Sequence, residues 1–245
     1  MDLANPSAPR DEGAIDIGGV AQAVALRSGR LYVADLDGGV VVVELPAEGE
    51  PRVIGSIDLP GQVHDVAAMG AAPVGSARAL AVGWSEGVTS WDLASPRAPG
   101  RAWRLPTLGR ANSVALRDDL ALVADLEAGL QIVDVSDQSA PRVVGSLVLP
   151  NGERPLPSAF YVAVEGSHAY VAYKIQNVVQ AVDVSDPEHP REVARIGGWK
   201  AYAREALEFW EICESTAQHP TEHFAGLYEE ISRWHTPPPH EFAHT

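Results

Sequence analysis

The sequence is poor in several residue types, and each shortage narrows the choice of function. It has one cysteine, Cys213, so an intrachain disulfide framework is excluded. It has 18 basic against 33 acidic residues, which gives a net charge of −15 at pH 7. Phosphate backbones and anionic membrane surfaces repel such a protein, so nucleic acid is not an expected partner. Only two of the basic residues are lysines, and this bias towards arginine suggests a bacterial source.

Long apolar runs are missing too. No stretch reaches the roughly eighteen consecutive apolar residues of a membrane-spanning helix, so no membrane span is predicted. The opening residues, MDLANPSAPRDEG, are polar and lack the apolar core of a signal peptide, which leaves the cytoplasm as the default localisation. Nucleophile and phosphate-loop motifs are absent as well, so the sequence does not favour an enzyme.

What the sequence does contain is an internal repeat. An acidic residue followed by an aliphatic one recurs at Glu44, Asp92, Asp134 and Asp183, at intervals of 48, 42 and 49 residues. Three β-rich stretches precede each of these positions, and a fourth follows behind a proline-containing loop. In the first copy the four stretches are AQAVAL, LYVAD, VVVVEL and PRVIGS. Each repeat of about 46 residues is therefore predicted to form one four-stranded antiparallel sheet.

Sheets of this kind bury their apolar faces by stacking on one another, which predicts an all-β fold, a β-propeller. The prediction is four four-stranded repeats followed by a C-terminal α-helical extension. The expected boundaries are a partial leading repeat over 2–19, repeats over about 20–61, 62–109, 110–157 and 158–198, and the extension over 199–245.

The leading segment raises a question of closure. Its sequence aligns with the end of the third repeat, so that Asp2 matches Asp134 and Pro9 matches Pro141. The segment is therefore expected to form an outer strand. Because the last repeat has an outer strand of its own, one strand is surplus. Either four blades close alone, or the chain is an open arc that a partner completes. The second alternative predicts a homodimer with an interface at Ile15–Ile17 or in the stripe from Trp199 to Trp210.

The repeats resemble a known family. The segments LVADLEAGLQIVDVSDQSAPRVVGS and AVDVSDPEHPREVA are similar to the repeats of the bacterial and archaeal LVIVD family. The likeness spans about residues 2–198 and is weakest in the second copy, where Gly83-Trp84 and Ser90-Trp91 replace the usual residues. The resemblance implies a β-propeller with a binding or surface-associated role, and it implies no catalytic residues.

After Gly198 the apolar residues follow helical spacing in two segments, the second of which begins near Pro220. Their apolar stripes must be buried, either as a cap on an exposed blade edge or against a second subunit. The predicted interface residues are Trp199, Phe209, Trp210, Phe224 and Trp234.

A candidate binding site comes from the innermost strands, which line the central channel of a propeller. Polar residues recur there at two successive levels, which predicts a site for a small molecule or a cation. Alternatively, these groups satisfy the inner-strand backbone and bound water. The predicted ligand-binding residues are Gln22, His64, Asp65, Asn112, Ser113 and Tyr161, and Phe160 shares the first level.

Metal sites are weaker hypotheses. His219 and His223 lie four residues apart in HPTEH, a spacing suited to a transition metal. The acidic pairs Asp35/Asp37 and Asp125/Glu127 are better explained by strand turns than by calcium. No cofactor is predicted, and a divalent cation is the one alternative.

Two functions follow from these observations. The first is a non-catalytic interaction module whose partner is another protein or a second copy. The second is a small hydrolase or lyase with a polar, metal-assisted site at the channel mouth, around His64, Asp65, Asn112 and Tyr161.

Overall fold

The protein is described from a computed structural model that covers residues 13–69, 78–93, 100–137, 139–149 and 158–197. The chain divides into two compact units, Met1–Gly197 and Gly198–Thr245. The second unit lies outside the described residues, so the predicted helices, the His219/His223 pair and the aromatic interface residues from Trp199 to Trp234 stay predictions. Among the described residues, no helix is long and apolar enough to cross a membrane.

The first unit holds four four-stranded antiparallel sheets, each formed by consecutive strands. We call them blades 1 to 4. Blade 1 consists of β1 (Ala21–Arg27), β2 (Arg30–Asp35), β3 (Gly39–Glu44) and β4 (Arg52–Ile57). Blade 2 consists of β5 (Val63–Met69), β6 (Arg78–Gly83), β7 (Gly87–Asp92) and β8 (Gly100–Leu105). Blade 3 consists of β9 (Ser113–Arg117), β10 (Leu120–Ala124), β11 (Leu130–Asp134) and β12 (Arg142–Leu147), and blade 4 of β13 (Ala159–Glu165), β14 (His168–Tyr173), β15 (Val178–Asp183) and β16 (Arg191–Gly197).

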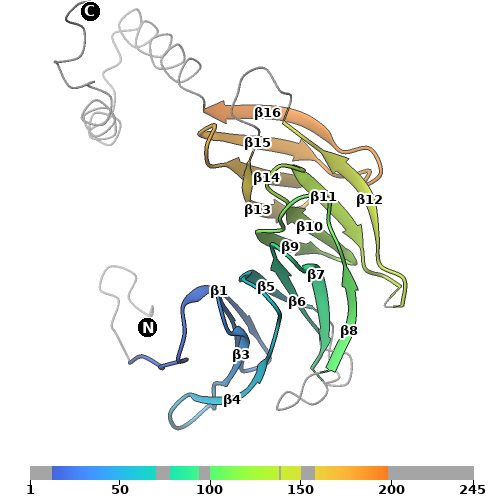
Figure 1. Cartoon of the computed structure of the whole chain (residues 1–245). Coiled ribbons are helices and arrows are strands. Elements are labelled where there is room, and N and C mark those ends of the chain that lie inside the picture. Colours follow the sequence, from blue (N-terminus) through green and yellow to red (C-terminus); the bar gives the residue numbers. More distant parts are fainter. Residues whose placement is uncertain (1–12, 70–77, 94–99, 138, 150–157, 198–245) are drawn as a thin grey trace, which may run out of the picture. The chain divides into compact units, whose positions relative to one another are not determined.

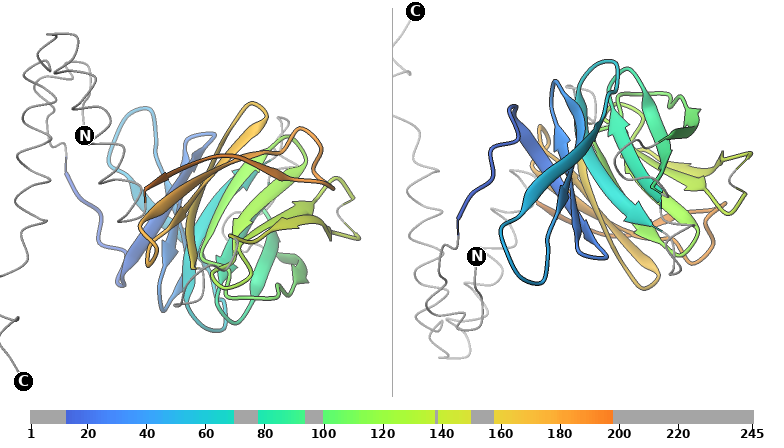
Figure 2. Two further views of the ribbon diagram at one scale, coloured as in Figure 1. Left: turned by 90° about the horizontal axis from the view of Figure 1, so that it is seen from above. Right: turned by 90° about the horizontal axis from the view of Figure 1, so that it is seen from below.

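The blades follow one another in chain order along an arc, from blue blade 1 to orange blade 4 (Figure 1). The inner strands pack in sequence, β1 against β5, β5 against β9 and β9 against β13. Views from above and below show the twist of each sheet (Figure 2), as the chirality of L-residues requires. The predicted all-β propeller-type architecture is confirmed.

The middle strands of blades 1 to 3 are buried on both faces. In β3, the run Val40–Val43 is almost fully buried, which suits a β-branched segment covered on both sides. The turn that leads into this strand needs glycine, because a Cβ on Gly39 would lie 2.0 Å from the Ile57 carbonyl oxygen and φ is +88°. Gly87 and Gly129 hold the corresponding places in blades 2 and 3.

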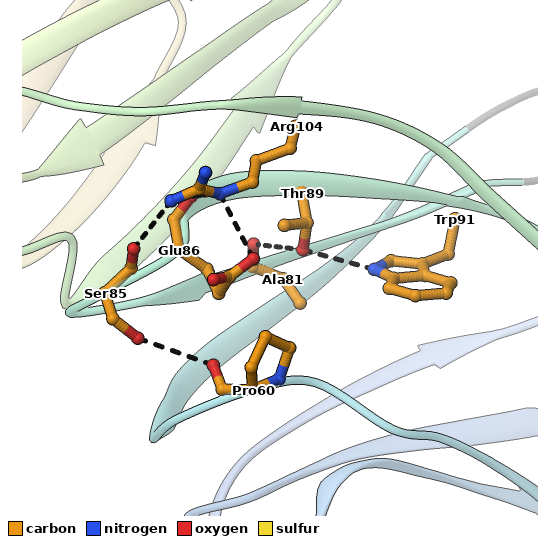
Figure 3. A network of polar contacts seen from close by, with 7 residues as sticks. All are labelled: Pro60, Ala81, Ser85, Glu86, Thr89, Trp91 and Arg104. Carbon is orange, nitrogen blue, oxygen red and sulfur yellow. Dashed lines mark hydrogen bonds and ion pairs between the residues drawn. The ribbon is translucent and has the colours of Figure 1, made fainter.

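Blade 2 departs from this pattern, because its third strand is GVTSWD. Two of its side chains bond inside the blade: Thr89 donates to the Ala81 carbonyl at 3.2 Å and Trp91 Nε1 donates to Thr89 Oγ1 at 3.1 Å (Figure 3). The Ser90 hydroxyl is buried and has no hydrogen-bond partner among the described residues. Arg104 of β8 closes the β6–β7 turn through the Ser85 carbonyl at 2.8 Å and the Glu86 carboxylate at 3.1 Å. Thr89 takes the position of Val41 in blade 1 and of Gln131 and Gln180 in blades 3 and 4.

Three apolar layers join neighbouring blades. Between blades 1 and 2 lie Tyr32 and Val42 with Val66, and between blades 3 and 4 lie Leu122 and Leu130 among others. A fourth, smaller cluster covers part of the free face of blade 1, where Ile15 and Ile17 pack against three buried valines of β2 and β3. Residues 13–17 were expected to belong to an outer strand but form no strand. They nevertheless pack on a blade face.

Candidate binding site at the start of the inner strands

The inner strands of blades 1, 2 and 4 begin with the same irregularity. Their pairing with the second strand skips one residue, which is Gln22 in β1, His64 in β5 and Phe160 in β13. Asn112 directly precedes β9 and completes the set. A β-bulge bends the strand and redirects the side chain of the extra residue. The register thus places the four first-level residues of the sequence prediction at equivalent positions.

The next level ties the blades together. Asp65 of blade 2 accepts hydrogen bonds from Ser113 Oγ and from the Val114 backbone N–H, both at 2.9 Å, across the boundary to blade 3. Ser113 Oγ in turn accepts a 3.4 Å hydrogen bond from the Val162 N–H of blade 4. Burial raises the pKa of the Asp65 carboxyl, and these donors partly offset that rise. Asp65 and Ser113 therefore act as inter-blade links.

Asn112 links three blades. Its buried side chain accepts a hydrogen bond from Trp84 Nε1 of blade 2 at 3.3 Å and donates to the Phe160 carbonyl of blade 4 at 2.8 Å. Both ends of the amide are satisfied, as buried polar groups require. Asn112 thus holds its neighbours in place and has little freedom to bind anything else.

An aromatic and cationic group around Trp84 is partly exposed at this site. The Trp84 ring is stacked on His64, with centroids 4.6 Å apart, and the Arg110 guanidinium carbon lies 4.8 Å from the Trp84 centroid. Arg110 also forms an ion pair with Glu127. Trp84 keeps 37% of its surface exposed, so an aromatic edge faces solvent beside a cation.

His64 is the one unsatisfied member of this group. Its Nε2 atom is buried and has no hydrogen-bond partner among the described residues. Burial lowers the pKa of the imidazole, so His64 is neutral at pH 7. A neutral imidazole without a bonded carboxylate or nucleophile stacks well but is not set up for general-base catalysis.

A second aromatic and cationic pair lies in blade 4. Lys174 Nζ is 4.7 Å from the Phe160 centroid, and Tyr161 packs edge-on against Phe160 at 5.3 Å. Tyr161 is itself largely exposed on the face of blade 4 that points away from blade 3. Gln22 forms no hydrogen bond with the other predicted residues in the described part of the chain. The structure therefore brings together His64, Asp65, Asn112 and Ser113, and leaves Gln22 and Tyr161 at the two ends of the arc.

Sequence reasoning missed Trp84, Arg110 and Lys174. Aligning LAVGW with LYVAD puts Trp84 on Asp35, but the register pairs Gly83 with Gly87 as it pairs Asp35 with Gly39. Trp84 thus lies in the turn itself. The equivalent turn position holds Leu36 in blade 1, Leu126 in blade 3 and Lys174 in blade 4, so an aromatic residue there was the available signal.

The acidic residues of the turns have structural partners. Asp35 accepts from the Val20 N–H at 2.8 Å, and Asp125 accepts from Thr107 Oγ1 at 2.7 Å and the Gly109 N–H at 2.9 Å. Each fixes the segment that enters its own blade. Asp134 and Asp183 cap local turns through Ser136 and Ser185, and these hydrogen bonds lower their pKa values. The turn interpretation is confirmed for Asp134 and Asp183, whereas the side chains of Asp35 and Asp125 bond to the segments that enter their blades.

No group of three or more His, Cys, Asp or Glu side chains in the described ranges could hold a metal ion. The single carboxylate of the candidate site, Asp65, is occupied by hydrogen bonds. Hard cations need several oxygen ligands. The described residues of this site therefore offer one carboxylate, which is fewer oxygen ligands than a hard cation takes.

Stacked four-stranded antiparallel blades with adjacent inner strands define the chain as a β-propeller protein. The LVIVD-repeat model matches residues 18–58, 108–148 and 158–196, which are blades 1, 3 and 4. The chain therefore belongs to the LVIVD-repeat family. The unmatched segment is blade 2, whose third strand reads GVTSWD where blade 1 has GVVVVE.

Solved structures show the same fold. A crystal structure of a protein from Lactobacillus plantarum matches with a TM-score of 0.62 and 14% identity, over 76% of this chain and 58% of that one. The β-propeller domain of Cps50 (Swd1) from Myceliophteria thermophila matches with a TM-score of 0.57 and 11% identity, over 73% of this chain and 59% of that one. The chain thus spans less than two thirds of either protein. No curated protein sequence matches it.

Proposed function

We propose that the protein is a non-catalytic β-propeller module that binds another protein through the surface formed by His64, Trp84 and Arg110, with Phe160 and Lys174 beside it. The observation that carries this proposal is the half-open Trp84 ring, with the His64 imidazole and the Arg110 guanidinium both at stacking distance. Tryptophan, tyrosine and arginine dominate the binding energy of protein interfaces.

The chemistry of the surface indicates what the partner carries. Two cations, Arg110 and Lys174, each lie against an aromatic ring, whereas the chain as a whole is strongly acidic. A partner segment with an apolar or aromatic side chain next to a carboxylate would bury the Trp84 edge and pair with the cations. We therefore expect the bound segment to be acidic and aromatic.

The hydrolase or lyase alternative lacks support from the geometry. Catalysis at this site would use His64 or Asp65 as a base. Asp65 accepts three hydrogen bonds, and the free His64 nitrogen is buried without a nucleophile beside it in the described chain. A binding role uses these residues as they stand.

A peptide-display selection against the immobilised protein tests the proposal, with peptide affinity measured by fluorescence anisotropy. We expect enrichment of acidic, aromatic peptides, and a loss of affinity of about thirty-fold in Trp84→Ala and in Arg110→Ala. Arg52→Ala is the matched control, because Arg52 is also exposed and paired with a glutamate, Glu44, but lies on outer strand β4. Its affinity should not change. Equal affinities in all three variants would refute the proposed surface.

A further inference from the structure

Every blade has a forward face, towards the next blade, and a back face, towards the previous one. The strand registers define equivalent positions on these faces in all four blades. One forward position is Tyr32, Leu80, Leu122 and Tyr170 in blades 1 to 4, and another is Val40, Val88, Leu130 and Val179. In blades 1 to 3 both positions are buried against the following blade.

Blade 4 has the same forward face with nothing on it in the described chain. Tyr32 is 2% exposed, whereas Tyr170, at the equivalent position, is 41% exposed. Val179 is 39% exposed, although Val40, Val88 and Leu130 are each 0% exposed. The face is apolar over most of its length and has one charged end, formed by Glu165, His168, Asp183 and Arg191. Its apolar residues come from all four strands: Tyr161, Ala163, Tyr170, Ala172, Val179, Ala181, Ala194 and Ile196. A continuous apolar sheet face of this kind indicates a missing partner.

The back face of blade 1 shows the same contrast from the other end. Val66, Val114 and Val162 are equivalent positions in blades 2 to 4, and they are 4%, 7% and 9% exposed. Their counterpart in blade 1, Val24, is 61% exposed. Leu26, two residues further along β1, is also exposed. The inner half of this face therefore lacks the cover that every other blade receives.

These two faces are the two halves of the interface that the chain already builds three times. We infer that the forward face of blade 4 docks on the back face of blade 1 of a second copy, and that two copies close one ring. A single two-fold axis along the channel then creates both contacts, because each copy offers one forward and one back face. Sheet-on-sheet stacking is what the equivalent residues do in all three internal interfaces. This inference does not depend on the proposed binding surface.

The segment before β1 bears on this docking. Ile15 and Ile17 align in sequence with Leu147 and Leu149, whose side chains pack between blades 3 and 4. They lie on the outer half of the blade 1 back face, where Ile196 of a second copy would come to rest. Ile15 and Ile17 therefore compete with the second copy for this face, and the second copy displaces them when it docks. Because deleting residues 1–17 removes this competition, the deletion should lower the dissociation constant of the dimer. Loss of the dimer on deletion would contradict the docking of blade 4 at this place.

Complementation between two broken faces tests the inference. Val24→Glu damages the back face and Val179→Glu the forward face, and both positions are exposed in one chain, so each variant should fold. Light scattering should give twice the 26.0 kDa chain mass for the unaltered protein and one chain mass for each variant. An equimolar mixture of the variants should form a heterodimer, because one forward and one back face remain intact. We expect the dissociation constant of each variant alone to rise at least a hundredfold.

Val143→Glu is the matched control, because Val143 lies on an outer strand of internal blade 3 and is 41% exposed, like Val179. It should leave the dimer mass unchanged. A single-chain mass for the unaltered protein would overturn the inference, and so would a mixture that fails to associate. A dimer that survives Val24→Glu but not Val179→Glu would also overturn it, since two forward faces would then be pairing with each other.

Discussion

The forward faces of blades 3 and 4 have nearly the same design and opposite surroundings. Leu122 and Leu130 of blade 3 are fully buried, whereas Tyr170 and Val179, at the same register positions, are open. The difference does not come from the strands, which pair in the same order in both blades. It comes from the neighbour, because a propeller blade cannot bury its own face. The exposed face of an end blade therefore marks a place where a neighbouring sheet can pack.

Side-chain hydrogen bonds also distinguish the internal blade boundaries from the exposed face of blade 4. The internal boundaries between blades 2, 3 and 4 are joined by Asp65, Ser113 and Asn112. At the free end of blade 4, the position of Asp65 and Ser113 is taken by Tyr161, which is exposed. These internal boundaries combine buried hydrogen bonds with apolar contact, whereas the end face has an exposed tyrosine at the position of the hydrogen-bonding residues. This difference suits a boundary that forms between chains.

The largest expected effect is a difference in stability between substitutions on the forward faces of blades 3 and 4. In the Val24→Glu background, where the chains stay single, Leu122→Ala should cost about 2–5 kcal/mol of unfolding free energy, because it leaves a cavity between blades 3 and 4. Tyr170→Ala should cost less than about 1 kcal/mol there, since its side chain is half open. Urea denaturation measures both. Equal losses would mean that another part of the same chain already covers the forward face of blade 4.

A smaller effect concerns pH. Tyr173, on the back face of blade 4, donates to Gln180 at 3.0 Å, and burial raises its pKa to about 12. In the unfolded chain a tyrosine ionises near pH 10, so the stability that Tyr173 contributes is complete below about pH 10 and is lost as pH rises towards 12. The loss should reach about 2–3 kcal/mol.

Tyr173→Phe should remove this alkaline loss and cost about 1–2 kcal/mol at pH 7, because Gln180 loses a buried donor. Tyr170→Phe, on the opposite face of β14, is the matched control and should keep the alkaline slope of the unaltered protein. Denaturation midpoints between pH 8 and pH 12 measure the two slopes. An unchanged slope in Tyr173→Phe would contradict the account of this residue.

The repeat made most of the fold predictable. Turn residues and β-branched runs recur at a regular spacing, so the four sheets and their order could be predicted from the sequence. The site was harder, because side-chain partners lie in neighbouring blades, 28 residues apart for Trp84 and Asn112 and 48 for Asp65 and Ser113. Sequence spacing identified the level of His64 and Asn112. It could not show that Asn112 is occupied by its neighbours or that Trp84 lies over His64.

The central claim is that the end faces of blades 1 and 4 are halves of one interface between two copies. Electron-microscopy class averages of the unaltered 245-residue chain test it most directly, because they count blades around the axis. The account predicts a closed ring of eight blades, four from each of two chains. Isolated four-bladed particles, whether open arcs or closed rings, would contradict it.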